Sequence, residues 1–257
     1  MSGRSEKRCE ESKRAFVRTM FGGIVRRYEL VNFLMTFGRV GAWRRFVVRT
    51  AVADPECRLL DVGCGTGALA RAALSMGAEV QPVGVDFAFP MINEARRLDP
   101  AGRIALCVAD GLTLPFADSS FDAVVSGFLL RNTLDVRAAL MEQVRVVRPG
   151  GRVVALETAP PQGSAFAPVI RFFLRFAVPA LGAVFAGRWE AYRYLAASTE
   201  SFLPAEELAG LFEEVGLEEI GCKSFMFGAI LVMWGKRSRV DPPANTSYTP
   251  ERYSSPA

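Results

Sequence analysis

The stretch L-L-D-V-G-C-G-T-G-A-L-A, residues 59–70, combines residue types that can hold a small-molecule ligand. An apolar run ends in Asp61, and Gly63, Gly65 and Gly67 follow at alternate positions before helix-forming residues resume. A glycine-rich turn between a strand and a helix lets a ligand lie against bare backbone. The spacing alone leaves a dinucleotide and a phosphate-free nucleoside open, because the dinucleotide fingerprint also tolerates alanine at its last position.

Two further carboxylates follow the next predicted strands. Asp86 ends the second strand and Asp110 ends the third. Acids at such places accept hydrogen bonds from ribose hydroxyls or from an exocyclic amine. One acidic strand end is explained by surface exposure alone, but three in succession beside a glycine turn favour a ligand site. A ligand that carries an amine, a ribose and an adenine fits this set, so we predict S-adenosylmethionine rather than NAD.

The composition excludes several kinds of catalytic site. The 257 residues include no histidine, which rules out imidazole bases, catalytic triads built on histidine and histidine-ligated metals. The five cysteines are scattered and never in a C-x-x-C spacing, which argues against a zinc site and a disulfide framework. We therefore expect no metal ion and a reducing, cytoplasmic compartment.

The charge is uneven along the chain. Residues 1–50 hold 12 Lys and Arg against 4 Asp and Glu, whereas the rest of the chain is net acidic. A basic leading segment is either a solvated helix face or a contact for anionic lipid or nucleic acid. We expect no nucleic-acid partner. No stretch reaches the roughly 18 uninterrupted apolar residues of a membrane-spanning helix, and the first residues lack an apolar signal core.

Apolar periodicity predicts strands that alternate with helices. Strands are expected at 58–62, 80–86, 104–109, 121–127 and 152–157, and helices at 66–76, 88–98 and 134–147. A turn at R-P-G-G, residues 148–151, should end the last of these helices, and a helix over 204–214 should precede two closing strands around Gly228. This alternation predicts an α/β fold with a doubly wound, mostly parallel seven-stranded sheet.

The predicted organisation is one domain with flexible ends. Residues 14–236 should form the domain, with an N-terminal helical segment at 14–50 and a helical insertion at 163–202 after the fifth strand. Residues 1–13 are expected to be flexible. The Pro-, Ser- and Thr-rich tail at 237–257 is expected to be disordered.

The order of motifs resembles that of class I S-adenosylmethionine-dependent methyltransferases: D-V-G-x-G-T-G, V-D, A-D-x-x-x-L-P-F and R-x-V-R-P-G-G. Three more specific pieces are similar to the ubiquinone/menaquinone biosynthesis C-methyltransferase family: F-x-x-I-x-x-x-Y-x-x-x-N at 21–32, F-x-L-R-N-x-x-D at 128–135 and E-A-Y-R-Y-L-x-x-S at 190–198. The resemblance implies a Rossmann-like fold and conversion of S-adenosylmethionine to S-adenosylhomocysteine. It also implies a polyprenylated quinol substrate, either a demethylmenaquinol or a methoxy-polyprenyl-benzoquinol.

Carried over by position, the resemblance implies cofactor contacts at Thr66, Asp86, Asp110, Gly111 and Gly127, with the glycines of the turn along the methionine part. The chain departs from the family pattern at three places. Ala68 replaces an acid, Leu129 replaces a glycine and Glu29 replaces an aspartate. These departures leave the cofactor assignment intact and leave the ring of the substrate open.

Methyl transfer to carbon needs positioned partners and a ring activated as a phenolate. Arg131 is the candidate for stabilising that phenolate, because its charge is permanent and lowers a phenol's pKa. Asn132 could orient a water molecule, and Tyr28 could close over the site and bind substrate. The alternatives are structural: a salt bridge from Arg131 to Asp135, and a role for Tyr28 in fixing the N-terminal helix.

Residues 166–187 are apolar except for Arg171 and Arg175, and Pro179 interrupts them. We predict a lid with one apolar face that lines a channel for the polyprenyl tail or touches the inner membrane surface peripherally. Core packing and a homodimer interface are the alternatives for this segment.

Three rival functions of the whole protein stay open. They are a methyltransferase for another small aromatic or lipid acceptor, a non-catalytic scaffold subunit of a quinone-synthesis complex and a dinucleotide-dependent oxidoreductase.

Overall fold

The structure, a computed structural model, describes residues 19–239 except 21, 24, 26, 77–78 and 161–165. Its seven-stranded sheet has the order β3-β2-β1-β4-β5-β7-β6. The strands are β1 (Cys57–Val62), β2 (Val80–Asp86), β3 (Ala105–Val108), β4 (Phe121–Gly127), β5 (Val147–Thr158), β6 (Leu217–Phe225) and β7 (Ile230–Arg237). Strands β1 to β5 pair in parallel, and β7 runs antiparallel to both of its neighbours. The predicted doubly wound, mostly parallel α/β sheet is confirmed.

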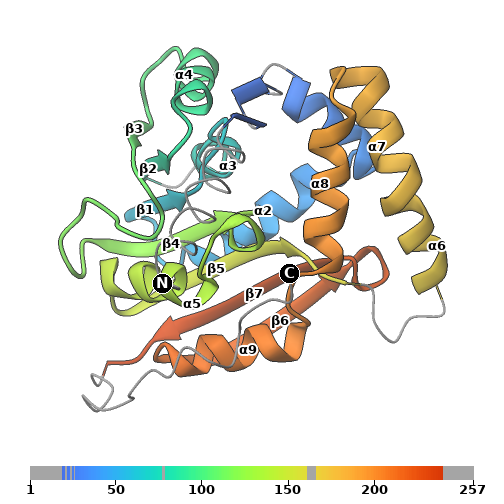
Figure 1. The fold of residues 1–257 in the computed structure, drawn as a ribbon. Helices are drawn as coiled ribbons and strands as arrows, with labels where there is room; N and C mark the ends of the chain where they lie inside the picture. The colour runs from blue at the N-terminus through green and yellow to red at the C-terminus, as the bar shows by residue number, and fades with distance from the viewer. Residues whose placement is uncertain are drawn as a thin grey trace, which may run out of the picture.

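Helices cover both faces of this sheet. They are α2 (Val40–Ala51), α3 (Ala68–Leu74), α4 (Phe89–Leu98), α5 (Val136–Val146) and α9 (Ala205–Glu214). Leu140 of α5 and Phe212 of α9 belong to the core on one face, and Trp43 and Val47 of α2 to the core on the other (Figure 1). Burial on both faces explains why the parallel strands read as apolar runs.

The direction of the chain through the sheet reverses between β1 and β4. From β1 the chain moves outward through β2 to β3, and then returns to place β4 on the other side of β1. In an open parallel sheet, this reversal leaves a crevice at the carboxyl ends of the strands. The glycine turn after β1 lies at that crevice.

The R-P-G-G segment differs from its prediction as a turn. Helix α5 ends at Val146 and β5 begins at the next residue. The pairing register jumps from Phe121 opposite Val147 to Ala123 opposite Arg152, so the segment forms a bulge within the strand. Its left-handed glycine, Gly150 (φ +80°), permits that bend.

The helical insertion is built from α6 (Ala167–Phe172), η2 (Phe173–Ala177), α7 (Val178–Leu181), η3 (Gly182–Ala186) and α8 (Trp189–Glu200). The first four join into one helix of 20 residues that continues through Pro179, contrary to the predicted interruption. The carbonyls that the missing N–H of Pro179 would have bonded lie in the wide π-type turn η2, directly before α7. Among the described residues this helix is long and apolar enough to cross a membrane, although the sequence analysis expected no such segment.

The insertion packs against the helix at residues 27–35 (Figure 1). Val31 of that helix joins Val178, Ala191 and Tyr192 in a separate small core. The two segments therefore stand together beside the carboxyl edge of the sheet. The predicted flexible residues 1–13 and the tail beyond 239 lie outside the described part of the chain, and those predictions remain untested.

We predict that Gly182→Ala destabilises the insertion. A Cβ at Gly182 would lie 2.1 Å from the Tyr192 ring, so the helix pair must separate. The control is Gly210→Ala in α9, where a Cβ meets nothing within 4 Å and gains about 1 kcal/mol of helix propensity. Thermal denaturation should show a lower Tm for Gly182→Ala and a higher Tm for Gly210→Ala. An unchanged Tm for Gly182→Ala would contradict the packing described.

Candidate functional site

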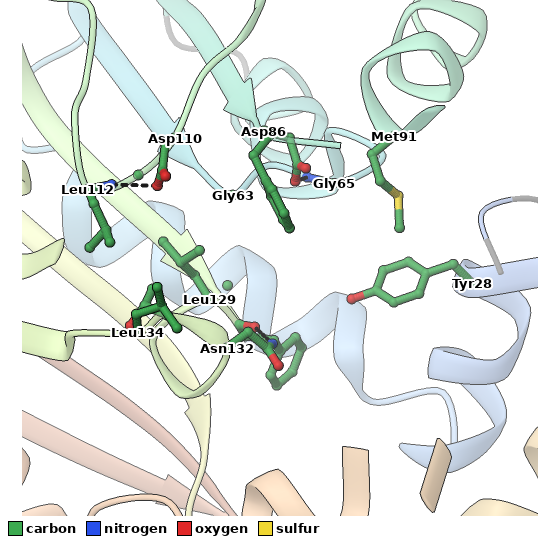
Figure 2. A pocket seen from close by; sticks show the side chains of 15 residues that line it. Tyr28, Gly63, Gly65, Asp86, Met91, Asp110, Leu112, Leu129, Asn132 and Leu134 are labelled. Carbon is green, nitrogen blue, oxygen red and sulfur yellow. Dashed lines mark hydrogen bonds between the residues drawn. The ribbon is translucent and has the colours of Figure 1, made fainter. Parts of the chain in front are cut away.

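A cavity of about 90 Å³ opens at the carboxyl edge of the sheet. We call it the glycine-loop cavity; Figure 2 shows Asp86 and Asp110 on one side and the Tyr28 hydroxyl entering from the other. Six residues predicted to contact a cofactor line it: Gly63, Gly65, Asp86, Asp110, Gly111 and Gly127. Among the described lining residues there are two carboxylates and no lysine or arginine. This charge pattern suits a cationic ligand and disfavours a pyrophosphate.

The glycine turn adopts the left-handed backbone that its sequence predicts. Gly63, Gly65 and Gly67 have φ values of +67°, +53° and +77°. A Cβ at Gly63 would meet Leu129 Cδ1 at 2.7 Å, whereas one at Gly65 would project into open space. The Leu129 that replaces the family's glycine therefore packs directly on this loop.

Asp86 is a buried carboxylate that organises the loop. Its Oδ2 accepts from the Gly65 N–H at 2.9 Å, and its Oδ1 accepts from the Ala88 N–H at 2.8 Å. Desolvation raises its pKa to about 6. Each carboxylate oxygen has a second lone pair, so Asp86 can also accept from ligand hydroxyls.

Asp61 lies under the loop and outside the lining of the cavity. Its Oδ2 accepts from the Ala70 N–H at 3.2 Å in the first turn of α3, and its Oδ1 is buried without a partner. Desolvation is the largest cause that raises its pKa to about 7, and the charge of Asp86 adds to it. A buried acceptor without a partner is costly, and a cationic ligand nearby would offset that cost.

The rest of the predicted cofactor set divides between the cavity and the loop beneath it. Asp110 accepts from the Leu112 N–H at 3.0 Å, and Gly111 and Gly127 allow the chain to pass close to Val62 and Leu69. Gly67 is the N-cap of α3 and does not line the cavity.

Thr66 does not line the cavity either. Its hydroxyl donates to Glu29 Oε1 at 2.8 Å. Glu29 in turn accepts two hydrogen bonds from Arg44. This contact could not be predicted from the sequence, because Glu29 and Thr66 are 37 positions apart and no local pattern links them.

A second cavity, of about 270 Å³, lies beside the first and is mostly apolar. We call it the apolar cavity. The helix at 27–35 and the insertion supply much of its lining, and Tyr28 and Phe128 line both cavities. Among its described lining residues Arg131 is the one charged side chain. Desolvation raises the pKa of Tyr28, so its hydroxyl stays protonated and can donate.

Arg131 forms a buried ion pair, but not with Asp135. Its Nη1 lies 2.8 Å from Glu157 Oε2, and both side chains are at most 3 % exposed. Asp135 instead caps α5 by accepting from the Ala138 N–H at 2.9 Å. The alternative of an Arg131–Asp135 bridge is therefore wrong, because a residue at the N-cap directs its carboxylate to the helix backbone. Glu157 is a site residue that the sequence analysis missed, although it ends a predicted strand as the other acids do.

The guanidinium of Arg131 retains donor capacity. Its Nε is buried without a partner, and its Cζ lies 5.1 Å from the centre of the Phe128 ring. Asn132 donates from Nδ2 to the Phe128 carbonyl at 2.8 Å, which leaves its Oδ1 buried and unpartnered. Phe128 itself has a left-handed backbone (φ +58°). Such strain in a non-glycine residue is typical of functional sites.

Residues 7–237 match the ubiE/COQ5 methyltransferase family. A ubiquinone/menaquinone biosynthesis C-methyltransferase from Desulfotalea psychrophila is 40% identical over 90% of this chain and 95% of its own. A demethylmenaquinone methyltransferase from Thermus thermophilus is 39% identical over 85% of this chain and all of its own. The chain belongs to the ubiE/COQ5 methyltransferase family. It is an S-adenosylmethionine-dependent methyltransferase, as its motifs predicted, and the oxidoreductase alternative is set aside.

Solved structures agree on the fold of this methyltransferase. An S-adenosylmethionine-dependent methyltransferase from Thermotoga maritima superposes with a TM-score of 0.62 at 19% identity, over 86% of this chain and 99% of the other. Phosphoethanolamine N-methyltransferase 2 of Haemonchus contortus, solved with S-adenosyl-L-methionine, gives a TM-score of 0.58 at 16% identity, over 77% of this chain and 53% of the other. The predicted Rossmann-like methyltransferase fold is thus confirmed.

We predict that Asp61→Asn stabilises the unliganded enzyme at pH 8 more than at pH 5. The folded-state pKa of about 7 lies above the ordinary value, so the stability contributed by the protonated acid is lost as the pH rises to 7. Asparagine removes the buried charge and keeps an acceptor for the Ala70 N–H. Each kcal/mol recovered raises the Tm by about 2–4 °C in a domain of this size.

The control for this prediction is Asp54→Asn, whose side chain is 68 % exposed and remains in contact with water. Thermal denaturation at both pH values should show little change for the control. Equal gains for Asp61→Asn at pH 5 and pH 8 would mean that the carboxylate of Asp61 is not desolvated as described.

Proposed function

We propose that this enzyme methylates a ring carbon of a polyprenylated quinol, either a demethylmenaquinol or a methoxy-polyprenyl-benzoquinol. Methylation of a quinone precursor is the activity named for its relatives. The observation that carries the proposal is Arg131, the one charged side chain among the described residues that line the apolar cavity, which shares Tyr28 and Phe128 with the glycine-loop cavity. Such a chamber suits a lipid-tailed acceptor that becomes an anion during the reaction.

The glycine-loop cavity fits S-adenosylmethionine. Asp86 would hold the ribose hydroxyls, Asp110 the exocyclic amine of adenine, and the backbone at Gly63 and Gly65 the methionine part. The unpartnered Oδ1 of Asp61 and the absence of basic side chains from the described lining support a cationic ligand. When bound, S-adenosylmethionine supplies the methyl group, whose bond to sulfur breaks as its bond to the ring carbon forms. The proton on that carbon then leaves to water, which restores the aromatic ring, and S-adenosylhomocysteine is the other product. No step in this proposal requires a metal ion.

The residues between the two cavities activate the acceptor. Arg131 stabilises the phenolate of a ring hydroxyl, which increases the nucleophilicity of the ring carbon. Glu157 fixes one edge of the guanidinium and leaves Nε to face the acceptor. The Asn132 Oδ1 can accept from the substrate or from a water molecule. The Tyr28 hydroxyl donates across the junction and helps to exclude solvent.

The outer part of the apolar cavity would hold the polyprenyl tail. Several large apolar side chains around it are exposed, and together we call them the aromatic face: Phe33, Phe37, Phe166, Val169, Phe172, Phe176 and Phe227. Three arginines and no acid lie within residues 166–189 of the insertion. A basic, aromatic surface suits peripheral contact with an anionic membrane. We therefore place the enzyme in the cytoplasm, in contact with the inner face of the membrane.

The test of the acceptor is the mass of the product. Incubation with S-adenosylmethionine and a reduced demethylmenaquinone should give a quinone that is heavier by one methylene unit and methylated on carbon. The double variant Arg131→Met with Glu157→Gln removes both buried charges together, which avoids an unpaired buried carboxylate. Its turnover should fall by about 10²- to 10³-fold while its affinity for S-adenosylhomocysteine stays near that of the wild type. Wild-type turnover in this variant would refute the role of Arg131.

Two neighbouring phenylalanines allow the proposed binding of the polyprenyl tail and the proposed membrane contact to be tested separately. Phe173 lines the apolar cavity and contacts Phe37, with 5.7 Å between ring centres, whereas Phe172 is 65 % exposed. Phe173→Asp should raise the KM for a long-tailed quinol in detergent and spare a tailless analogue, because each buried CH₂ contributes about 0.8 kcal/mol. Phe172→Asp should instead weaken sedimentation with anionic vesicles and keep both KM values. Equal damage to both quinols by Phe173→Asp would mean that this ring supports the fold.

A further inference from the structure

The carboxylate of Glu29 connects the helix at 27–35 to the glycine loop that follows β1. Glu29 Oε1 accepts from Thr66 Oγ1 at 2.8 Å and from Arg44 Nη2 at 3.2 Å, while Oε2 accepts from Arg44 Nη1 at 2.7 Å. The three residues come from the helix at 27–35, the glycine loop and α2. Arg44 is a fixed anchor, because its neighbours Trp43 and Val47 on α2 are buried in the core.

The helix that Glu29 holds carries residues of both cavities. Tyr28 lines the two cavities, and Asn32 and Met35 line the apolar one. Figure 2 shows the Tyr28 side chain reaching from this helix into the glycine-loop cavity. A shift of Glu29 would therefore move part of the wall that surrounds the acceptor.

Thr66 is part of the glycine loop, so the position of its hydroxyl depends on the conformation of the loop. It lies between Gly65 and Gly67, both left-handed, and it is 1 % exposed. A ligand that rests on the backbone at Gly63 and Gly65 restricts this loop and so fixes the direction of the Thr66 hydroxyl. When a ligand restricts the glycine loop, the helix at 27–35 loses less conformational entropy on contacting it. Ligand binding and ordering of the helix are then coupled in free energy.

We propose that Glu29 is a positioning residue that couples cofactor binding to ordering of the helix at 27–35, so that the cofactor binds before the acceptor. The resemblance implied that Thr66 contacts the cofactor, but here its hydroxyl is directed to Glu29. An aspartate at position 29 would be shorter by one methylene. The longer side chain of Glu29 spans the distance to Thr66 and Arg44 together. The proposal rests on S-adenosylmethionine as the cofactor and is independent of the acceptor's identity.

The experiment is hydrogen exchange of the peptide that covers residues 27–35, with and without saturating S-adenosylhomocysteine, on the full chain. The wild type should gain about tenfold protection on binding, within the 5- to 150-fold range of coupled sites. Thr66→Val removes the hydroxyl at nearly constant shape and should reduce the gain below about twofold while calorimetry still shows binding. Thr66→Ser keeps the hydroxyl and should restore the gain. Glu29→Asp should give a gain as small as that of Thr66→Val.

Three other outcomes of this experiment would contradict, in turn, the coupling through Glu29, the role given to Thr66 and the assignment of the glycine-loop cavity. If the Thr66→Val enzyme binds S-adenosylhomocysteine and gains the same protection as the wild type, Glu29 does not transmit the state of the loop. If Thr66→Val abolishes binding and Thr66→Ser restores it, Thr66 is a cofactor contact and the coupling role is refuted. If the folded wild type itself does not bind S-adenosylhomocysteine, it is the assignment of the glycine-loop cavity that fails.

Discussion

Three carboxylates buried at the carboxyl edge of the parallel sheet constrain everything built around them. Asp61 is the second-to-last residue of β1, Asp86 is the last residue of β2, and Glu157 is the second-to-last residue of β5. Each of the three residues is at most 8 % exposed. A buried carboxylate is tolerated only where donors surround it. The donors here are backbone N–H groups of the following turns and the guanidinium of Arg131. These hydrogen bonds fix the start of α3, the glycine loop and the turn after β4, while Oδ1 of Asp61 keeps no partner.

The same constraint explains why the site is suited to its reaction. Desolvation raises the pKa of Asp61 and Asp86 to about 7 and 6, so part of the folding stability at neutral pH is given up at this edge. A cationic ligand recovers it by favouring the ionised forms. In the neighbouring cavity the arrangement is reversed, since one cation faces apolar walls. Under the proposed function, an acceptor that gains negative charge would be stabilised there, with the protonated Tyr28 hydroxyl at the junction of the two cavities.

Local sequence patterns predicted most of the helices and strands. The predictions were wrong at two segments whose conformation depends on the surrounding structure. Alternating apolar runs identified all seven strands, and the glycine turn adopts left-handed backbone as expected. The R-P-G-G segment was expected to be a turn, but it lies within β5 as an unpaired bulge between Val147 and Arg152, which both pair with β4. Pro179 was expected to interrupt the apolar segment at 166–187, but the helix continues through it after the wide turn η2.

The sequence by itself determined the doubly wound sheet, the family and the acids at the strand ends, because each depends on residue type and on spacing along a short stretch. Only the tertiary structure decided which charges meet. Arg131 pairs with Glu157 rather than with the nearby Asp135, and Glu29 reaches Thr66. These partners are separated by 26 and 37 positions. The physical reason is that an ion pair depends on distance through space, and the winding of the chain brings together residues whose separation in sequence carries no signal.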